Sequence, residues 1–218
     1  MSRPSHSGLF VTLEGGEGAG KTTLIAALEA CALALGREVV RTREPGGTEG
    51  ADQIRALLVT GAADRWTPLS ELCLFFAARQ DHLERVIRPA LAAGKVVLCD
   101  RFSDSTRAYQ GQAGGSGLAA VDTLDALVVG QTQPDLTLIL DIDPEQGLAR
   151  AAARRGSEMR FESKTLDYHR ALRAAYLEIA RTYPHRCRVL DASQPPQVVA
   201  AAAIAHLDPL LQPGAVRP

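Results

Sequence analysis

Eight consecutive residues near the start of the chain have the spacing of a loop that holds phosphate groups. The run Gly15-Gly-Glu-Gly-Ala-Gly-Lys-Thr22 matches the pattern G-x-x-x-x-G-K-[ST]. Glycines let the backbone curl so that successive N–H groups face one anion, and the positive end of the following helix faces it too. Lys21 should reach the β- and γ-phosphates of a nucleoside triphosphate, and the Thr22 hydroxyl should ligate Mg²⁺. The alternative is a plain glycine-rich turn.

Basic side chains also follow two apolar runs that have the character of buried strands. Arg101 comes directly after Asp100 at the end of one run, and Arg43 follows another, with Arg55 in the next predicted helix. A guanidinium at such a place can bind the phosphate of an acceptor bidentately, and Arg43 and Arg55 can add further clamps. The alternative for Asp100 and Arg101 is a structural ion pair.

The phosphate loop alone indicates nucleotide binding without distinguishing kinases from GTPases, motors or ligases. A GTPase would be expected to carry the base-reading pattern N-K-x-D, and the sequence contains none. The arginines at the strand ends favour a kinase with a phosphorylated acceptor. A nucleotide-binding switch without an acceptor substrate remains the alternative.

The order of apolar runs predicts strands that alternate with helices. Strands are predicted at 9–13, 38–42, 96–99, 136–140 and 188–190, and helices at 21–35, 48–58, 69–93, 118–129, 144–153, 166–183 and 196–211. Pro89 should interrupt or kink the third of these helices. This alternation predicts a three-layer, doubly wound α/β fold with a parallel sheet, whose ligands bind beyond the carboxyl ends of the strands.

Composition fits one globular domain over residues 1–218. The chain has 46% hydrophobic residues and a formal net charge of −1, so it lacks the basic excess of a nucleic-acid-binding protein. Its four cysteines are far apart, which predicts reduced, mostly buried thiols and no zinc site. Neither a signal peptide nor a stretch of membrane-spanning length is evident, so a cytoplasmic protein without a membrane partner is expected.

Further segments give the chain a resemblance to a known family. They are T-R-E-P-G-G-T at 42–48, F-F-A-A-R at 75–79, D-R-F-S-D-S-T-R-A-Y-Q-G at 100–111 and P-D-L-T-L at 134–138. Together with the phosphate loop, they resemble bacterial thymidylate kinases, which are P-loop nucleoside-monophosphate kinases, from about Leu9 to Leu207. The resemblance implies Mg²⁺-dependent transfer of the ATP γ-phosphoryl group to dTMP, giving dTDP and ADP, in a homodimer. The candidate dimer faces are in helices 69–93 and 118–129, and the alternative is that the apolar residues of these helices belong to the core.

The same resemblance implies an acceptor site. Arg101 would hold the dTMP phosphate, with Asp100 near the reacting phosphates and Mg²⁺. Phe75 would stack on thymine and Arg79 would bind its carbonyl, although spacing alone favours a core Phe75 and a surface Arg79. The implied dTMP-binding residues are Glu17, Arg43, Arg55, Phe75, Arg79, Arg101, Ser105, Thr106, Tyr109 and Gln110. A kinase for another pyrimidine deoxynucleoside monophosphate is the alternative.

Four of these positions carry specific expectations. Tyr109 would pack under the deoxyribose and leave little room for a 2′-hydroxyl, while Thr106 and Gln110 would face the base. Glu17 is unexpected inside a phosphate loop, since a carboxylate repels the ligand. It either accepts a hydrogen bond from the acceptor 3′-hydroxyl, as an acidic residue here in related enzymes suggests, or points to solvent.

Four arginines fall within segment 150–164, namely Arg150, Arg154, Arg155 and Arg160. An Arg-rich segment here suits a mobile lid that closes over ATP, and a solvated basic loop is the alternative. Some relatives carry the catalytic arginine in the phosphate loop at the position of Gly18, so here the lid should supply it. Arg154 and Arg160 match best, although an extra residue leaves Arg155 open, and Arg150 is expected to stack on adenine beside the turn 191–195.

The complete predicted sets are therefore as follows. The catalytic residues are Lys21, Asp100, Arg101, Arg154 and Arg160. The ATP-binding residues are Gly15, Gly16, Glu17, Gly18, Ala19, Gly20, Lys21, Thr22, Thr23 and Arg150, and the Mg²⁺ ligands are Thr22 and Asp100.

Overall fold

Five parallel strands form the central sheet of the computed structural model, which describes residues 8–62, 64–153 and 164–212. The strands are β1 (Leu9–Gly15), β2 (Val39–Arg43), β3 (Val96–Asp100), β4 (Leu136–Asp141) and β5 (Cys187–Asp191), and their order across the sheet is β2-β3-β1-β4-β5. Because every pairing is parallel, all five carboxyl ends lie at one edge. The predicted fold class and all five predicted strands are confirmed.

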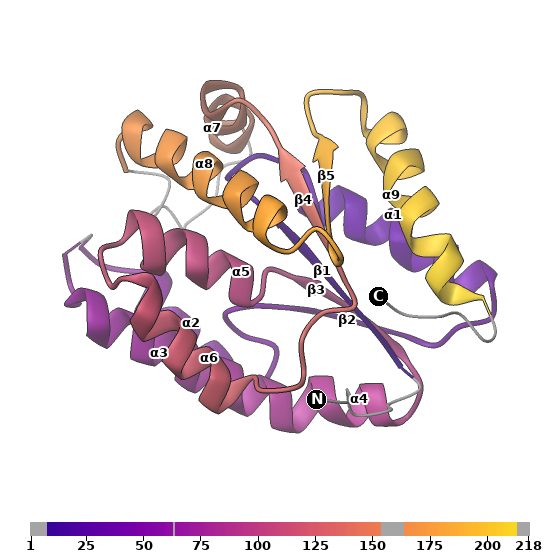
Figure 1. Cartoon of the computed structure of the whole chain (residues 1–218), viewed down its shortest axis with the longest axis horizontal. Helices are drawn as coiled ribbons and strands as arrows, with labels where there is room; N and C mark the ends of the chain where they lie inside the picture. The colour runs from indigo at the N-terminus through magenta and orange to yellow at the C-terminus, as the bar shows by residue number, and fades with distance from the viewer. Residues whose placement is uncertain (1–7, 63, 154–163, 213–218) are drawn as a thin grey trace.

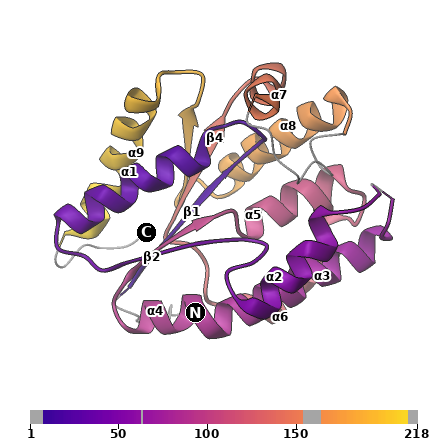
Figure 2. The same ribbon diagram turned by 180° about the vertical axis from the view of Figure 1, so that it is seen from behind.

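Helices cover both faces of this sheet and make it the middle of three layers (Figures 1 and 2). Helices α1 (Lys21–Ala34) and α9 (Pro196–Leu211) lie on one face. The other face carries α3 (Pro68–His82), η1 (Leu83–Ile87), α4 (Arg88–Ala92), α6 (Leu118–Val128) and α8 (Leu166–Thr182). Two further helices are α2 (Glu49–Val59), which packs on α3, and α7 (Pro144–Ala152), which packs on α8.

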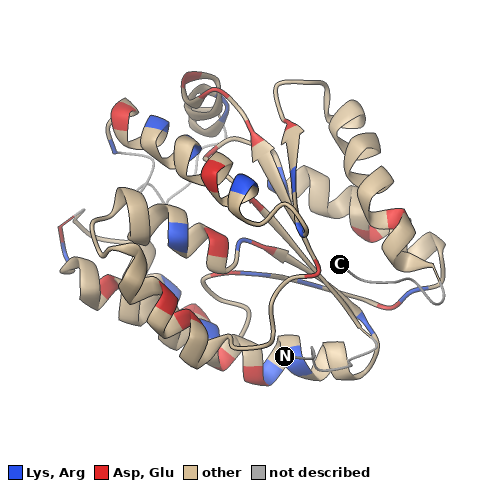
Figure 3. Cartoon of the chain, viewed as in Figure 1, with Lys and Arg blue, Asp and Glu red and all other residues tan. Residues whose placement is uncertain are grey.

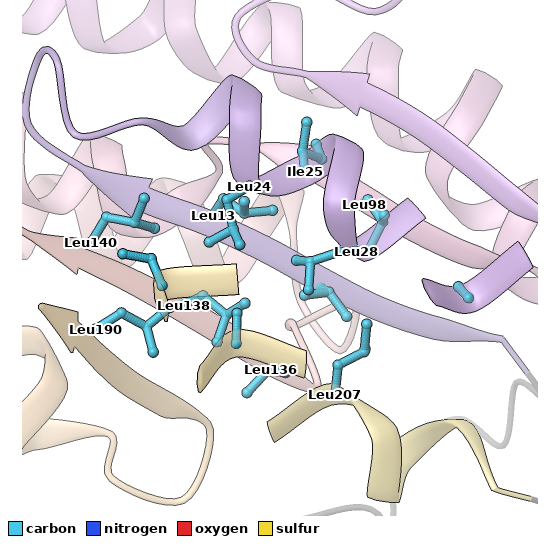
Figure 4. Packing of buried hydrophobic residues seen from close by; sticks show 14 of the residues in the cluster. Leu13, Leu24, Ile25, Leu28, Leu98, Leu136, Leu138, Leu140, Leu190 and Leu207 are labelled. Carbon is cyan, nitrogen blue, oxygen red and sulfur yellow. The ribbon is translucent and has the colours of Figure 1, made fainter. Parts of the chain in front are cut away.

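The core on the α1 and α9 face is built largely from leucines. Figure 4 shows Leu13 of β1 and Leu138 of β4 beneath Leu24 and Leu28 of α1, with Leu207 of α9 completing the layer. All seven residues of β1 are buried because helices cover the strand on both sides. This burial fixes β1 in place, and with it the phosphate loop that follows.

The structure differs from the predicted elements in two places. Helix 69–93 is not interrupted at Pro89; a π-helical turn, η1, precedes it, and Pro89 occupies the start of α4, where its missing N–H is tolerated. The polar segment after β3 has the composition of a loop, yet it folds into α5 (Ser103–Thr106) and the π-helix η2 (Arg107–Ala113). Tertiary contacts of its buried side chains outweigh its weak helix propensity.

The surface distribution of charge differs between the two layers. Figure 3 shows both acidic and basic residues on α3 and α8 and acidic residues on α6, whereas α9 is almost free of charged residues. Among the described residues, no helix combines the length and the apolar character needed to cross a membrane. Cys99 and Cys187 are buried, but Cys31 is half-buried and Cys73 exposed, so the expectation of mostly buried thiols is right for two of the four.

Candidate active site

The phosphate loop joins the end of β1 to the start of α1. Gly20 precedes α1 with a φ of +95°, a conformation that side chains rarely adopt, so glycine is needed here. Lys21 begins the helix, and its Nζ donates hydrogen bonds to the carbonyl oxygens of Gly15 at 3.2 Å and Gly16 at 3.1 Å. The ammonium group is thus held across the loop, while the Thr22 side chain is exposed beside it.

A cavity of about 530 Å³ lies at the carboxyl ends of β2 and β3, next to this loop. Lys21 and Arg101 both line it, together with Asp100 at the end of β3. In the described part of the chain, the residues predicted to bind the donor phosphates and those predicted to bind the acceptor phosphate therefore line the same cavity. All ten predicted dTMP-binding residues also line it: Glu17, Arg43, Arg55, Phe75, Arg79, Arg101, Ser105, Thr106, Tyr109 and Gln110.

Arg101 lies at the middle of a dense polar cluster. Its Nη2 donates to Glu17 Oε2 at 2.8 Å, and its Nη1 donates to the Gly15 carbonyl oxygen, Ser105 Oγ and Tyr176 Oη at 3.0–3.1 Å. The ion pair is therefore with Glu17, and the expected alternative of an Asp100–Arg101 pair is wrong. Arg101 also adopts a φ of +69°, a strained conformation that is found preferentially at functional sites.

Glu17 turns toward the acceptor side of the loop. Only 11% of its side chain is exposed, and both carboxylate oxygens accept hydrogen bonds from the Tyr109 hydroxyl, at 2.8 and 2.9 Å. The alternative of a solvent-pointing Glu17 is therefore wrong. The Arg101 guanidinium carbon lies 4.9 Å from the centre of the Tyr109 ring, so the three side chains form one unit.

The far end of the cavity is formed by α3 and η2. Arg79 is 2% exposed rather than on the surface, which contradicts the expectation from spacing alone. Its Nε donates to Glu44 Oε2 at 2.7 Å and its Nη2 to Thr106 Oγ1 at 2.9 Å. Among the described residues, its buried Nη1 has no hydrogen-bond partner. Phe75, four residues earlier on α3, is half-buried beside it.

The remaining acceptor-side residues surround this end. Gln110 is buried, and its Nε2 donates to Glu71 Oε1 at 3.0 Å. Arg43 pairs with Asp52 at 3.5 Å, and Arg55 Nη1 donates to the Pro45 carbonyl oxygen at 2.8 Å. Cavity-lining residues missing from the prediction are Glu44, Pro45, Val59, Phe102 and Ala151. Glu44 and Pro45 had a sequence signal in T-R-E-P-G-G, and Phe102 had one in the segment 100–111, whereas Val59 and Ala151 look like ordinary apolar residues.

The predicted ATP-binding residues divide into two groups. Positions 17–22 line the cavity, whereas Gly15, Gly16, Thr23 and Arg150 are not among its lining residues. Arg150 lies at the end of α7 instead, and its Nη1 donates to the Ala192 carbonyl oxygen at 2.8 Å, against the predicted adenine turn. Arg154, Arg155 and Arg160 lie outside the described residues.

The thymidylate kinase family model matches residues 13–203. The chain belongs to the thymidylate kinase family. The match includes the phosphate loop, the T-R-E-P-G-G segment and the Asp100–Arg101 pair, which supply much of the cavity lining.

Individual relatives of the family agree over nearly the whole chain. The chain is 57% identical over 195 residues to a thymidylate kinase of Caulobacter vibrioides, covering 89% of this chain and 93% of the relative. It is 52% identical over 197 residues to one of Ruegeria pomeroyi, covering 90% and 93%. The crystal structure of thymidylate kinase from Ehrlichia chaffeensis superposes with a TM-score of 0.76 at 34% identity, over 92% of this chain and 98% of that one.

Burial and neighbouring charges shift the pKa values of three groups in or beside the phosphate loop. Burial of the Glu14 carboxyl, together with the nearby Asp104 charge, raises its pKa to about 8. Burial and the Arg101 charge lower the pKa of Lys21 to about 8. For Glu17, burial would raise the pKa, but the charges of Arg101 and Lys21 outweigh it and lower the pKa. The Glu17 carboxyl is thus ionised at neutral pH, whereas the Glu14 carboxyl stays protonated up to about pH 8.

This difference predicts a pH dependence of stability that depends on Glu14. Its pKa is about 8 in the folded protein and 4.5 in the unfolded chain, so between these values only the folded state holds the proton. Stability then falls as the pH rises from 4.5 to 8, by at most about 1.4 kcal/mol per pH unit. In Glu14→Gln, which imitates the protonated carboxyl, urea unfolding at pH 5, 6.5 and 8 should show a flatter dependence.

The exposed Glu178 provides the matched control for this experiment. Its side chain is 57% exposed in an ion pair with Arg181, so Glu178→Gln should keep the wild-type pH profile. If Glu14→Gln and the wild type lose equal stability between pH 5 and pH 8, Glu14 does not titrate as inferred.

Two glycines bring α7 into contact with the phosphate loop. Gly18 has a φ of +69°, and a Cβ atom at this position would overlap the carbonyl group of Gly147 on α7. A Cβ atom on Gly147 would lie 2.5 Å from the Glu17 carbonyl oxygen. A side chain at position 18 is therefore sterically excluded in this arrangement.

The contact predicts an unusual effect for Gly147→Ala. Alanine within a helix normally stabilises by about 1 kcal/mol relative to glycine. Here the methyl group meets backbone, so we expect a net loss of about 1–3 kcal/mol in urea unfolding. Gly50→Ala in α2 is the control, because its Cβ would meet only the Asp81 side chain at 3.2 Å and should not destabilise. A Gly147→Ala protein more stable than the wild type contradicts the contact.

Proposed function

We propose that this protein is a kinase that transfers the γ-phosphoryl group of ATP to dTMP, giving dTDP and ADP. The observation that carries the proposal is that Lys21 and Arg101 line one cavity, at whose other end Arg79 has a buried guanidinium nitrogen without a partner in the described chain. Lys21 suits a phosphate of the donor and Arg101 the phosphate of the acceptor, while the unpaired nitrogen of Arg79 suits the base of the acceptor. Membership of the thymidylate kinase family supports the same reaction.

The donor triphosphate is bound by the loop between β1 and α1. The residues assigned to ATP are those of positions 15–23, with Lys21 on the β- and γ-phosphates. A phosphate beside Lys21 raises the pKa of its ammonium again, so the bound lysine is charged at neutral pH. Arg150 lies against the turn at Ala192 and is assigned to the adenine side.

The side chains near the loop also suit a magnesium ion. The exposed Thr22 hydroxyl and the Asp100 carboxylate offer oxygen ligands beside the cavity, the ligand type that Mg²⁺ prefers. The described residues contain no cluster of three or more His, Cys, Asp or Glu side chains able to hold a metal, and Mg²⁺ bound mainly through phosphates and water needs none. When bound, the ion neutralises charge on the phosphates.

Arg101 is assigned to the acceptor phosphate, with Arg43 and Arg55 as further clamps. Phosphoryl transfer depends on positioning and on stabilisation of charge, and it requires little general-base catalysis. An acceptor phosphate held by Arg101 lies within the same cavity as a γ-phosphate held by Lys21, so the two reactants are brought together. Further positive charge is assigned to Arg154 and Arg160 in the lid, 150–164.

The base end of the cavity suits a pyrimidine with a carbonyl at position 4. The Nη1 of Arg79 has N–H donors to offer and is buried, so it favours an acceptor oxygen over an amino group. Phe75 offers a ring face for stacking, and Thr106 and Gln110 add polar groups. Cytosine would place its amino group against the guanidinium, leaving buried donors unpaired.

The sugar lies between base and phosphate, near Tyr109 and Glu17. The Tyr109 ring packs against Arg101, which limits the room for a 2′-hydroxyl group. The Glu17 carboxylate is directed to the acceptor side by Tyr109 and Arg101, where it can accept a hydrogen bond from the 3′-hydroxyl. This arrangement favours a deoxyribose with a free 3′-hydroxyl.

We further propose a homodimer formed through α3 and α6. Leu69, Leu118 and Leu127 on these helices are 57%, 42% and 78% exposed, although Leu72 and Val121 of the same helices are core residues. Light scattering should give a dimer mass, and Leu127→Asp should shift it toward the monomer. The four free thiols fit a cytoplasmic protein.

A panel of acceptors tests the proposed reaction. ADP release should depend on dTMP, with kcat/KM highest for dTMP, lower for dUMP, and far lower for dCMP and dGMP. A higher kcat/KM for dCMP than for dTMP would show that the protein is a kinase for another pyrimidine deoxynucleoside monophosphate. ATP binding without any acceptor-dependent ADP release would instead indicate a nucleotide-binding switch.

A further inference from the structure

A polar chain extends from Arg79 through Glu44, which also lines the cavity, to the buried His82 and the half-buried Thr42. Glu44, directly after β2, accepts a hydrogen bond from Arg79 Nε at 2.7 Å through Oε2, and its Oε1 lies 3.1 Å from His82 Nδ1. His82 Nε2 lies 2.7 Å from Thr42 Oγ1. Exposed fractions are 4% for Glu44 and 0% for His82, so water does not compete for the hydrogen bonds that Glu44 accepts from Arg79 and His82.

The chemistry of the groups fixes the direction of the hydrogen bond between His82 and Glu44. An ionised carboxylate only accepts, so His82 Nδ1 must carry the proton that it shares with Glu44. In the neutral imidazole the other nitrogen, Nε2, then accepts from the Thr42 hydroxyl. The chain of donors thus runs from Thr42 through His82 to Glu44, and Arg79 supplies the positive charge at its other end.

Packing leaves this chain little freedom to rearrange. A Cβ atom on Gly47 would lie 2.5 Å from His82 Nε2 and 2.7 Å from Thr42 Oγ1, so the backbone of the T-R-E-P-G-G segment fits closely over the imidazole. The backbone N–H of Glu44 donates to the Asp100 carbonyl oxygen at 2.9 Å, which ties Glu44 to β3. Arg79 itself lies between two rings, with its guanidinium carbon 4.9 Å from Phe76 and 5.0 Å from Phe102.

We infer that Glu44 and His82 are positioning residues that set the orientation of Arg79 and thereby the preference for a 4-oxo over a 4-amino pyrimidine. Glu44 accepts from the single Nε–H and Thr106 from one of the two N–H groups of Nη2, so among the described residues Nη1 is the guanidinium nitrogen whose two N–H groups are both left for a ligand. If Glu44 were displaced, the guanidinium could turn and offer other N–H groups. The inference rests on the proposed dTMP kinase function. It adds that residues which do not contact the base determine the selectivity of the enzyme for that base.

Glu44→Gln tests the carboxylate directly. A hydrogen bond to a charged group contributes enough to change an equilibrium constant about 10- to 100-fold, so we expect KM for dTMP to rise by at least about tenfold. The kcat/KM ratio of dTMP to dCMP should fall by a similar factor, while KM for ATP stays within about twofold of the wild type, because the donor site is not touched. Gln80→Ala, on the exposed side of α3, should leave every constant unchanged.

Two histidine variants keep the inference testable if Glu44→Gln does not fold. The amide of His82→Asn can replace the Nδ1–H donor to Glu44, whereas that of His82→Gln reaches the Nε2 position and loses it. We therefore expect the dTMP-to-dCMP ratio to fall in His82→Gln and to be largely retained in His82→Asn, with thermal melting confirming that both proteins are folded.

The outcomes separate the two levels of the proposal. Unchanged dTMP-to-dCMP ratios in Glu44→Gln and His82→Gln, or an equal rise in KM for ATP and dTMP, would overturn the positioning role alone. His82→Asn and His82→Gln proteins with equal losses would do the same. A wild-type protein that does not phosphorylate dTMP would refute the proposed function and, with it, this inference.

Discussion

Arg101→Ala is expected to reduce kcat/KM for dTMP by about 10³-fold or more, the effect of removing an arginine that stabilises charge in phosphoryl transfer. The guanidinium lines the cavity with Lys21, and its removal would leave the acceptor phosphate without its main cationic partner. Affinity for ATP should stay within about threefold of the wild type, because the contact is made with the acceptor. Steady-state kinetics and ATP titration of the same protein measure both quantities.

The neighbours of Arg101 make a second variant necessary. Removal of its side chain leaves the Glu17 carboxylate, 11% exposed, without its ion-pair partner beside the phosphate loop. The loss of ATP affinity that this charge causes in Arg101→Ala should be recovered when Glu17→Gln is added, without recovery of dTMP turnover. Arg101→Lys should remain well below wild type, since an ammonium cannot bind phosphate bidentately. An Arg101→Ala enzyme within tenfold of wild type would remove Arg101 from the acceptor site.

The strands and their order along the chain were predictable because their sequences carry strong local signals. The runs at 96–99 and 136–140 are buried on both faces, and an aspartate follows each of them. The sequence therefore shows both that these runs are strands and where each strand ends. The π-helical turn before Pro89 carries no such signal. It depends on how the whole helix packs against the sheet, which composition does not encode.

The candidate site was predictable where chemistry requires a fixed local spacing. The phosphate loop is such a case, since one turn of backbone must surround one anion. Arg79 was not, because its burial and its pairing with Glu44, 35 positions away, arise only when β2 and α3 come together. Spacing alone therefore favoured the wrong location for Arg79, and only the family resemblance suggested otherwise.

Arg186→Met is expected to destabilise the protein by about 3–5 kcal/mol, the typical effect of leaving one partner of a buried ion pair uncompensated. Arg186 donates to both carboxylate oxygens of Asp104, at 2.6 and 2.9 Å, and the two side chains are 6% and 2% exposed. Without the guanidinium, the Asp104 charge would remain buried near Glu14, whose pKa it already raises. Urea unfolding at pH 7 measures the loss.

Two controls separate the lost charge pair from lost packing. Arg181→Met removes an exposed arginine from an ion pair with Glu178 and should barely change stability. Asp104→Asn combined with Arg186→Met removes both charges and should recover a substantial part of the loss. A double variant no more stable than Arg186→Met would show that the buried charge is not the cause.

The same pair holds the segment after β3, which forms a helix although its sequence is that of a loop. Asp104 lies in α5 between Ser103 and Ser105, and Arg186, 82 positions later, holds it from the start of β5. Ser105, which contacts Arg101, therefore depends on an ion pair outside the cavity. We accordingly expect the Asp104→Asn and Arg186→Met double variant to fold, yet to bind dTMP more weakly than the wild type while binding ATP normally.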